Sequence, residues 1–377
     1  MSEDQNKKTP RIALRACADY EPQRLAGCLE ALLGDLGWIA DRVRGRRVLL
    51  KPNFLVARKP ERAVNTHPQL IRAMAAHVLE AGARQVLVAD SPAVGSARRV
   101  ARRLGLIELL APLGVEVVEL DEEVEVELPG ARFPRLRLAR RIVEAELVIN
   151  LAKLKTHGLC GLTAAVKNCF GAVVGLGKAR WHMRCGHDPR AFGELIVEVC
   201  RAVSPALSVV DAVVAMDGNG PGSGRPRALG LLAASTNPFA LDRVLACVCG
   251  IGADCPQVLT FAADGLPDPG RAELVGDAPG RFALGDWQMP RADRTRISRA
   301  LSGLSGRLLR RSVAPAPRFV HRDCTRCGQC IAICPAGALS LDGRRVRLAD
   351  RLCVRCYCCQ EICPEGAIRL RRGVLGR

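Results

Sequence analysis

Short apolar runs alternate with segments of helical periodicity along the first 250 residues. Runs typical of buried strands lie at about residues 46–53, 85–90, 115–120, 146–151 and 207–214. Helical segments are predicted at 68–81, 96–104, 161–170, 189–202 and 238–249. The first helix begins at Pro68 and is closed by Gly82, which are residue types that favour these positions. Apolar strands that alternate with helices predict an α/β fold, with a mostly parallel sheet and helices on both faces.

Polar and glycine-rich segments follow several of these strands, where ligands bind in α/β sheets. They form three groups: KPN (51–53) with NTHP (65–68) and DSP (90–92); the segment 150–182; and MDGNGPGSG (216–224) with NPFALD (237–242). Glycine-rich loops are most often simple turns, so each group also has a purely structural interpretation. Neither the P-loop motif nor the dinucleotide-binding glycine fingerprint is present, and no nucleotide site is predicted.

The segment from Asn150 to His182 gathers cationic side chains in an otherwise apolar, glycine-rich stretch. A lysine in such surroundings needs a partner, and a carboxylate or phosphate on a ligand would serve. The candidate residues for binding an anionic small molecule are Lys153, Lys155, Lys167, Asn168 and Lys178. His157 and His182 are candidates for general acid–base catalysis, because imidazole titrates near neutral pH. A lone histidine more often satisfies a backbone group, and that alternative stays open.

The most specific signal is a pair of cysteine runs near the C-terminus. The spacing C-x2-C-x2-C-x3-C-P occurs twice in register, and it is the bacterial ferredoxin run for [4Fe–4S] clusters. In each run the fourth cysteine ligates the other cluster. Two [4Fe–4S] clusters are therefore predicted, one on Cys324, Cys327, Cys330 and Cys363 and the other on Cys353, Cys356, Cys359 and Cys334. Cys358 is an additional cysteine beside a ligand and is expected to be a bystander.

The segment from His321 to Arg372 resembles the two-cluster bacterial-type ferredoxin domain, a small α+β unit, and the resemblance implies electron transfer. Three parts are expected: an α/β domain at 10–264, a linker at 265–319 and the ferredoxin domain at 320–377. Within the linker, Ile297, Leu301, Leu304 and Leu308 fall at helical spacing and predict a short basic amphipathic helix.

Positive charge is concentrated in the C-terminal part. The formal net charge is +18, and residues 291–377 carry 19 Arg and no Lys against 4 Asp and 2 Glu. A basic surface favours an acidic electron-transfer partner, such as a ferredoxin or flavodoxin. Nucleic-acid binding is not expected, because aromatic residues make up only 3% of the chain and no recognition motif is present. With no bilayer-spanning apolar run and no secretory signal, a cytoplasmic protein is expected.

Several segments resemble a family known as domain of unknown function 362. They are LLKPNFL, NTHP, VADSP, NLAKLKTHGLCGLTAAVKNCFGAVVGLGKARWH, MDGNGPGSG and NPFALD, and the resemblance covers about residues 10–260. The family usually has MEGNGP where this chain has MDGNGP, with Asp217 one methylene shorter. Members often carry a C-terminal pair of [4Fe–4S] motifs, but the resemblance implies no particular reaction.

The leading hypothesis is an iron–sulfur redox protein whose α/β domain binds an anionic substrate or an acidic redox partner. Whether it is an enzyme stays open; if it is one, a ferredoxin-coupled oxidoreductase is expected. The alternatives are a non-catalytic electron carrier or assembly factor, and a non-redox enzyme whose clusters are structural.

Overall fold

The structure, a computed structural model, describes residues 9–38, 40–158, 160–185, 189–251, 272–290 and 315–371. Within these ranges no helix is long and apolar enough to cross a lipid bilayer. The predicted linker helix around Leu301 lies outside the described residues. The expected domain boundaries therefore stay predictions.

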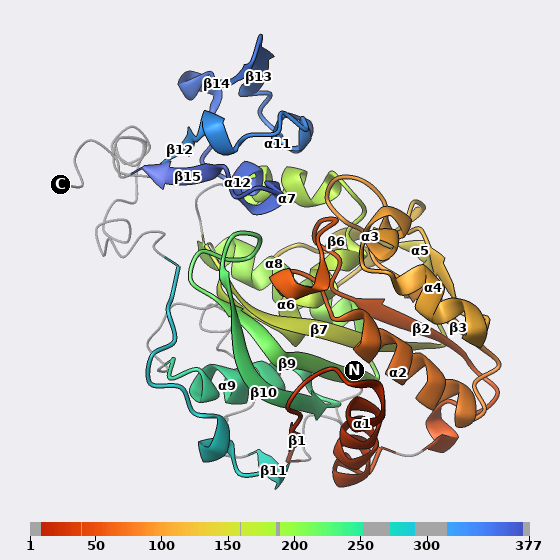
Figure 1. The fold of residues 1–377 in the computed structure, drawn as a ribbon. Coiled ribbons are helices and arrows are strands. Elements are labelled where there is room, and N and C mark those ends of the chain that lie inside the picture. The colour runs from red at the N-terminus through yellow and green to blue at the C-terminus, as the bar shows by residue number, and fades with distance from the viewer. Residues whose placement is uncertain are drawn as a thin grey trace.

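A nine-stranded mixed sheet forms the centre of the molecule (Figure 1). Its strands run in the order β11-β1-β10-β9-β7-β2-β3-β4, with β8 paired to β7. Neighbours from β9 to β4 are parallel, whereas β10 is antiparallel to both β9 and β1. The strands are β1 Arg11–Ala16, β2 Arg47–Pro52, β3 Gln85–Ala89, β4 Glu116–Val118, β7 Leu147–His157, β8 Gly161–Thr163, β9 Leu207–Asp217, β10 Arg225–Ser235 and β11 Glu273–Gly276.

Alternate residues of each strand pack on opposite faces of the sheet, as the pleat requires. Val48 and Leu50 of β2 join one apolar cluster, while Leu49 between them joins another. The first cluster includes residues of α1 Pro22–Leu36, α2 Pro68–Glu80, α3 Ala97–Arg103 and α4 Leu106–Leu110. On the opposite face lie α8 Pro189–Val203, α9 Pro238–Val248 and the short α5 Arg140–Val143 and α6 Ala165–Asn168. The predicted α/β fold with helices on both faces is thus confirmed.

The lysine-rich segment folds differently from its prediction. A helix was expected over 161–170, but Gly161–Thr163 is strand β8, and only Ala165–Asn168 is α-helical, followed by a 3₁₀ turn at Cys169–Ala172. β8 pairs with the end of β7, which continues through His157 instead of stopping at Leu151. This longer β7 places Lys153 and Lys155 on a buried strand, whereas Lys167 lies in α6. A further helix, α7 Gly177–Cys185, follows.

The C-terminal cysteine-rich part is a small α+β unit. It contains the strands β12 Ala316–Phe319, β13 Leu339–Asp342, β14 Arg345–Leu348 and β15 Ile368–Arg371, with the short helices α11 Gln329–Ala332 and α12 Cys358–Ile362. β12 pairs with β15, and β13 pairs with β14. A separate two-stranded ribbon of the α/β part, β5 Glu123–Glu127 with β6 Arg135–Ala139, lies outside the main sheet.

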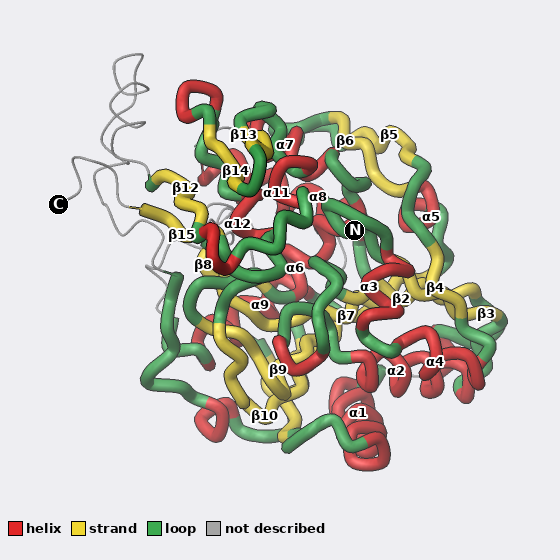
Figure 2. Tube along the Cα trace, turned by 45° about the horizontal axis from the view of Figure 1, so that its top comes forward, coloured by secondary structure: helices red, strands yellow, loops and turns green. Residues whose placement is uncertain are grey.

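This C-terminal unit packs on the α/β part rather than being tethered only by the chain. Figures 1 and 2 show α12 facing the region of α6 and α7. Val56, Val64 and Met216 belong to the same buried apolar cluster as Ile333 and Ile362. The Arg58 guanidinium donates a 3.1 Å hydrogen bond to the backbone oxygen of Cys363. The two parts therefore share a continuous apolar interface.

Candidate functional site

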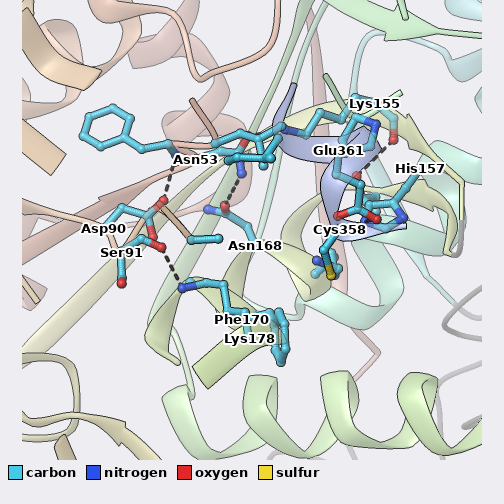
Figure 3. A pocket seen from close by; sticks show the side chains of 18 of the residues that line it. Asn53, Asp90, Ser91, Lys155, His157, Asn168, Phe170, Lys178, Cys358 and Glu361 are labelled. Carbon is cyan, nitrogen blue, oxygen red and sulfur yellow. Dashed lines mark hydrogen bonds and ion pairs between the residues drawn. The ribbon is translucent and has the colours of Figure 1, made fainter. Parts of the chain in front are cut away.

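A pocket between the two parts contains every binding and catalytic candidate from the sequence (Figure 3). The space between its walls is about 810 Å³, part of which is open to solvent. Its walls come from the ends of β2, β3 and β7, from α6 and α7, and from α12. We call it the central pocket. The seven predicted residues that line it are Lys153, Lys155, His157, Lys167, Asn168, Lys178 and His182.

Two lysines in and beneath this pocket are matched by carboxylates. The Lys153 ammonium lies 2.9 Å from an Asp211 carboxylate oxygen, and it also donates to the Tyr20 hydroxyl at 3.0 Å. Lys51 pairs in the same way with Asp90 at 2.9 Å. Both pairs are almost fully buried. Their positive charges are therefore balanced without a ligand.

Three other ammonium groups contact neutral groups, and among the described residues no carboxylate forms an ion pair with them. Lys155 donates to the Asn53 side-chain oxygen and to the Val64 carbonyl. Lys178 donates to the carbonyls of Ser91 and Val173. The ammonium of Lys167 lies 4.9 Å from the centroid of the Phe170 ring. The pocket thus holds surplus positive charge, as an anion-binding site requires.

Burial is the main reason why two of these lysines titrate near neutral pH. For Lys155, burial and then the charges of Lys167 and Lys153 lower the pKa to about 7. For Lys178, burial lowers the pKa to about 7 against the opposing effect of Asp90. An anion bound beside these groups would restore their full charge by raising both pKa values.

Side-chain amides hold the middle of the pocket in place. Asn168 donates to the Asn150 side-chain oxygen at 2.7 Å and to the Lys51 backbone oxygen at 3.2 Å. Its own side-chain oxygen accepts a 3.1 Å hydrogen bond from the Asn53 amide. These contacts link β7 and the end of β2 to α6. Asn168 is therefore a rigid part of the wall.

At the other end, the Nε2 atom of His157 lies 3.3 Å from a carboxylate oxygen of Glu361, a residue of α12. Burial alone would lower the pKa of His157, but Cys160 and Glu361 outweigh it and raise that pKa to about 9. Burial would raise the pKa of Glu361, but His157 lowers it to about 2, with help from His182 and Lys167.

The Cys160 amide donates to Nδ1 of His157 at 3.3 Å, which on its own would favour a neutral ring. The ion pair outweighs this long hydrogen bond, because a buried carboxylate without a counter-charge is strongly disfavoured.

His182, the second catalytic candidate, has different surroundings. Its ring centroid lies 4.2 Å from that of Phe192 and 6.3 Å from that of Phe170. Burial lowers the pKa of His182 to about 4. The Glu361 charge opposes this shift, and the Lys167 charge adds to it, both with smaller effects. His182 is therefore neutral at physiological pH and is suited to donating or accepting one hydrogen bond.

Two smaller cavities within the C-terminal unit separate the eight cysteines of the two runs. One encloses about 450 Å³ and is lined by Cys324, Cys327, Cys330 and Cys363. The other encloses about 360 Å³ and is lined by Cys353, Cys356, Cys359 and Cys334. In each cavity the fourth cysteine comes from the other run, which is the crossed pattern expected of two-cluster ferredoxins.

The thiol chemistry of these cavities suits a multi-iron cofactor. Burial, then Cys363, Cys327 and Cys324, raises the pKa of Cys330 to about 11. Crowded buried thiols of this kind become thiolates when a positively charged metal lies among them. No three Cys, His, Asp or Glu side chains of the described residues converge closely enough for a single metal ion. Four cysteines line each cavity, which is the number that one [4Fe–4S] cluster needs.

An α/β domain joined to a ferredoxin-type unit defines an iron–sulfur protein, and comparisons support this class. The family model described as a 4Fe-4S dicluster domain matches residues 323–367, and that described as Domain of unknown function (DUF362) matches residues 48–247. The chain belongs to the DUF362 family.

A curated relative and a solved structure were also found. The chain is 40% identical over 285 residues to the thylakoid-associated protein sll1697 of Synechocystis sp., covering 74% of this chain and 87% of that protein. The lactate racemase apoprotein from Thermoanaerobacterium thermosaccharolyticum matches with a TM-score of 0.42 and 13% identity. That match covers 66% of this chain and 58% of the other, and at this level of similarity it carries no argument about function.

Sequence reasoning missed the residues that the C-terminal unit contributes to the central pocket. They are Ile333, Cys358, Glu361 and Ile362. Each lies inside or beside a cysteine run, where the spacing explains the ligands but not their neighbours. Cys358, expected to be a bystander, faces the pocket in Figure 3. Only the packing of the two parts reveals this second role of the ferredoxin segment.

The close packing of the two parts can be tested by substitution of Gly222, which lies at their interface. A Cβ atom at Gly222 would overlap the backbone oxygen of Glu361. Gly222→Ala is therefore expected to push α12 away from the α/β part. Amide hydrogen exchange over residues 358–362 should accelerate at least tenfold, with the iron content unchanged. Gly27→Ala is the matched control, because Gly27 lies inside α1 with open space at its Cβ position. Unchanged exchange in α12 of Gly222→Ala would contradict the tight interface.

Proposed function

We propose that this protein is an oxidoreductase that moves single electrons between two [4Fe–4S] clusters and an anionic small molecule bound in the central pocket. One observation carries the proposal: the pocket wall contains the sequence neighbours of predicted ligands of both clusters. Ile333 precedes Cys334, Cys358 precedes Cys359, and Ile362 precedes Cys363. When bound, the clusters would supply or accept one electron at a time. A ligand in contact with these three side chains would touch residues that directly precede predicted cluster ligands in the chain.

The α/β side of the pocket supplies what electron transfer to a small molecule also needs. Lys155, Lys167 and Lys178 would attract and hold the anionic group. The His157–Glu361 pair and neutral His182 are placed to hold or pass protons at the pocket wall. The side chains of Ile333 and Ile362 exclude water between the ligand and the cysteine cavities. We assign these roles as part of the proposal.

We further propose that electrons are exchanged with an acidic carrier of the ferredoxin or flavodoxin class. The exposed surface of the C-terminal unit carries several arginines, which are Arg322, Arg344, Arg345, Arg347 and Arg369. Charge of this sign steers an acidic partner toward the cysteine-rich unit. A reducing cytoplasmic location would suit both the carrier and the free thiols of the described residues.

The proposal predicts saturable reoxidation of the reduced protein by an anionic acceptor. Anaerobically reduced full-length protein would be mixed with cinnamate or pyruvate, and cluster absorbance would be followed. Because Lys155 and Lys178 have pKa values of about 7, the half-saturating concentration should rise at least tenfold between about pH 6 and about pH 9. The sign follows because deprotonation removes the charges that bind the anion. Lys178→Met should raise this concentration at least tenfold at low pH.

Lys59→Met is the matched control, because Lys59 is an exposed lysine that does not line the pocket. Its half-saturating concentration should equal that of the unmodified protein. Reoxidation that is linear in acceptor concentration, and equal in the Lys178→Met variant, would refute a substrate site in the central pocket.

A further inference from the structure

The central pocket has opposite electrical character at its two ends. Figure 3 places Lys178 and Ser91 on one side and Glu361 with His157 on the other. We call the Lys178 end the lysine pole, and His157 with Glu361 the glutamate pole. At the lysine pole the Lys178 ammonium donates to two carbonyl oxygens and forms no ion pair with a carboxylate of the described residues, so positive charge dominates. At the glutamate pole the histidine is already matched by a carboxylate.

A ligand with two negative groups would therefore fit poorly. One anionic group would be attracted to the lysine pole, but a second would face the Glu361 carboxylate, which is already paired with His157. Like charges brought together in a partly desolvated pocket repel strongly. A neutral end fits better, and a hydrogen-bond donor fits best. The Glu361 Oε1 atom is buried and accepts no hydrogen bond from any residue in the described part of the chain, apart from its ion-pair contact with His157.

Apolar side chains line part of the stretch between the poles, beside the amides of Asn53 and Asn168. Phe170 lines it from the α/β side, with Leu55 and Ala179, while Ile333 and Ile362 line it from the ferredoxin-type side. Phe170 also packs edge-on against His182 and Phe192, which fixes its ring. Apolar walls of this kind bind the apolar body of a ligand by removing it from water. A purely polar anion would leave these walls without contacts.

We propose, on the basis of the proposed function, that the substrate class is an amphipathic monoanion. Its carboxylate or phosphate binds at the lysine pole, an apolar or aromatic body fills the middle, and an uncharged hydrogen-bond donor meets Glu361. Glu361 is thus the residue that sets specificity against dianions. It belongs to the ferredoxin-type unit, so that unit selects the substrate as well as holding the predicted clusters.

Four probes of matched shape test this inference on the full-length, cluster-loaded protein under anaerobic conditions. Dissociation constants would be measured by calorimetry for acetate, benzoate, 4-hydroxybenzoate and terephthalate. Benzoate is expected to bind at least tenfold more tightly than acetate, because only benzoate has an apolar body. Terephthalate is expected to bind at least tenfold more weakly than 4-hydroxybenzoate, because its second carboxylate faces Glu361. In the Glu361→Gln variant, the ratio of the dissociation constants of terephthalate and 4-hydroxybenzoate should fall to threefold or less.

Glu365→Gln is the matched control, since Glu365 is exposed and does not line the central pocket. It should keep the full discrimination against terephthalate. Equal binding of benzoate and acetate, or of terephthalate and 4-hydroxybenzoate, in the unmodified protein overturns the inference while leaving an anion site in place. If none of the four probes binds, the inference is overturned. If Lys178→Met also leaves the half-saturating acceptor concentration in the reoxidation experiment unchanged, the proposed function fails as well. The unmodified protein is decisive even if Glu361→Gln does not fold.

Discussion

A variant that lacks both Cys324 and Cys363 is expected to keep one intact cluster, whereas a variant that lacks Cys324 and Cys334 is expected to keep none. The first pair lines the same cavity, and the second pair lines different cavities although both residues belong to one run. Each [4Fe–4S] cluster needs four thiolates. Iron per chain should therefore fall from about eight to about four in the first variant, and well below four in the second.

Iron, acid-labile sulfide and the electron paramagnetic resonance of the reduced protein would distinguish these outcomes. Cys358→Ala is the control, because Cys358 lies between ligands but faces the central pocket rather than either cysteine cavity. It should retain about eight irons. The reverse pattern, with the Cys324 and Cys334 variant keeping one cluster, would mean that each run holds its own cluster. Such a result would place Ile333 and Ile362 beside different clusters from those proposed.

The elements that were predicted well are those in which local sequence and tertiary packing agree. The strands that begin near Arg47, Gln85 and Leu207 are apolar, and they belong to the parallel part of the sheet. The cysteine runs could be identified equally well from the sequence, because the spacing of ligands within a run is a local property. Their division between two cavities follows from the same spacing.

The lysine-rich segment was predicted to bind an anion but was given the wrong local structure. Residues 161–163 have helical neighbours in sequence, yet they pair with Lys155, Thr156 and His157 as strand β8. This pairing depends on tertiary structure, because β7 extends past the end of β2, whose last pair is Pro52 with Leu151, and β8 supplies backbone partners for the end of β7. Asn168 then remains helical in the short α6, where the buried Asp242 carboxylate accepts the free amides of Ala165 and Val166.

The glutamate pole could not be predicted at all from local pattern. Glu361 is an ordinary charged residue in a ferredoxin run, about 200 positions away from His157 in the chain. Its role depends on how the two parts pack, through Gly222, Arg58 and the shared apolar cluster. Because side chains from both parts form one pocket, neither part taken alone contains the whole site.

The Lys51→Met substitution is expected to destabilise the protein by about 3–5 kcal/mol, because it leaves a buried carboxylate without its counter-charge. The Lys51 ammonium and the Asp90 carboxylate are 0% and 3% exposed and 2.9 Å apart. Asp90 also accepts the Phe54 amide at 2.7 Å, so the pair fixes the loop that forms the floor of the central pocket. A Cβ atom at Gly171 would overlap both charged groups, which shows how closely the chain packs over them.

Anaerobic urea unfolding, followed by tryptophan fluorescence, to which the buried Trp38 contributes, would measure the loss of stability. Lys51→Met combined with Asp90→Asn should recover most of it, since asparagine keeps an acceptor for the Phe54 amide without a buried charge. Arg140→Ala breaks only the exposed pairs with Glu122 and Glu144 and should leave the stability almost unchanged. A similarly small loss for Lys51→Met would show that Asp90 does not carry a buried charge. The positive surplus of the pocket would then be larger than Lys155, Lys167 and Lys178 alone provide, and the predicted preference for a monoanion would lose its electrostatic basis.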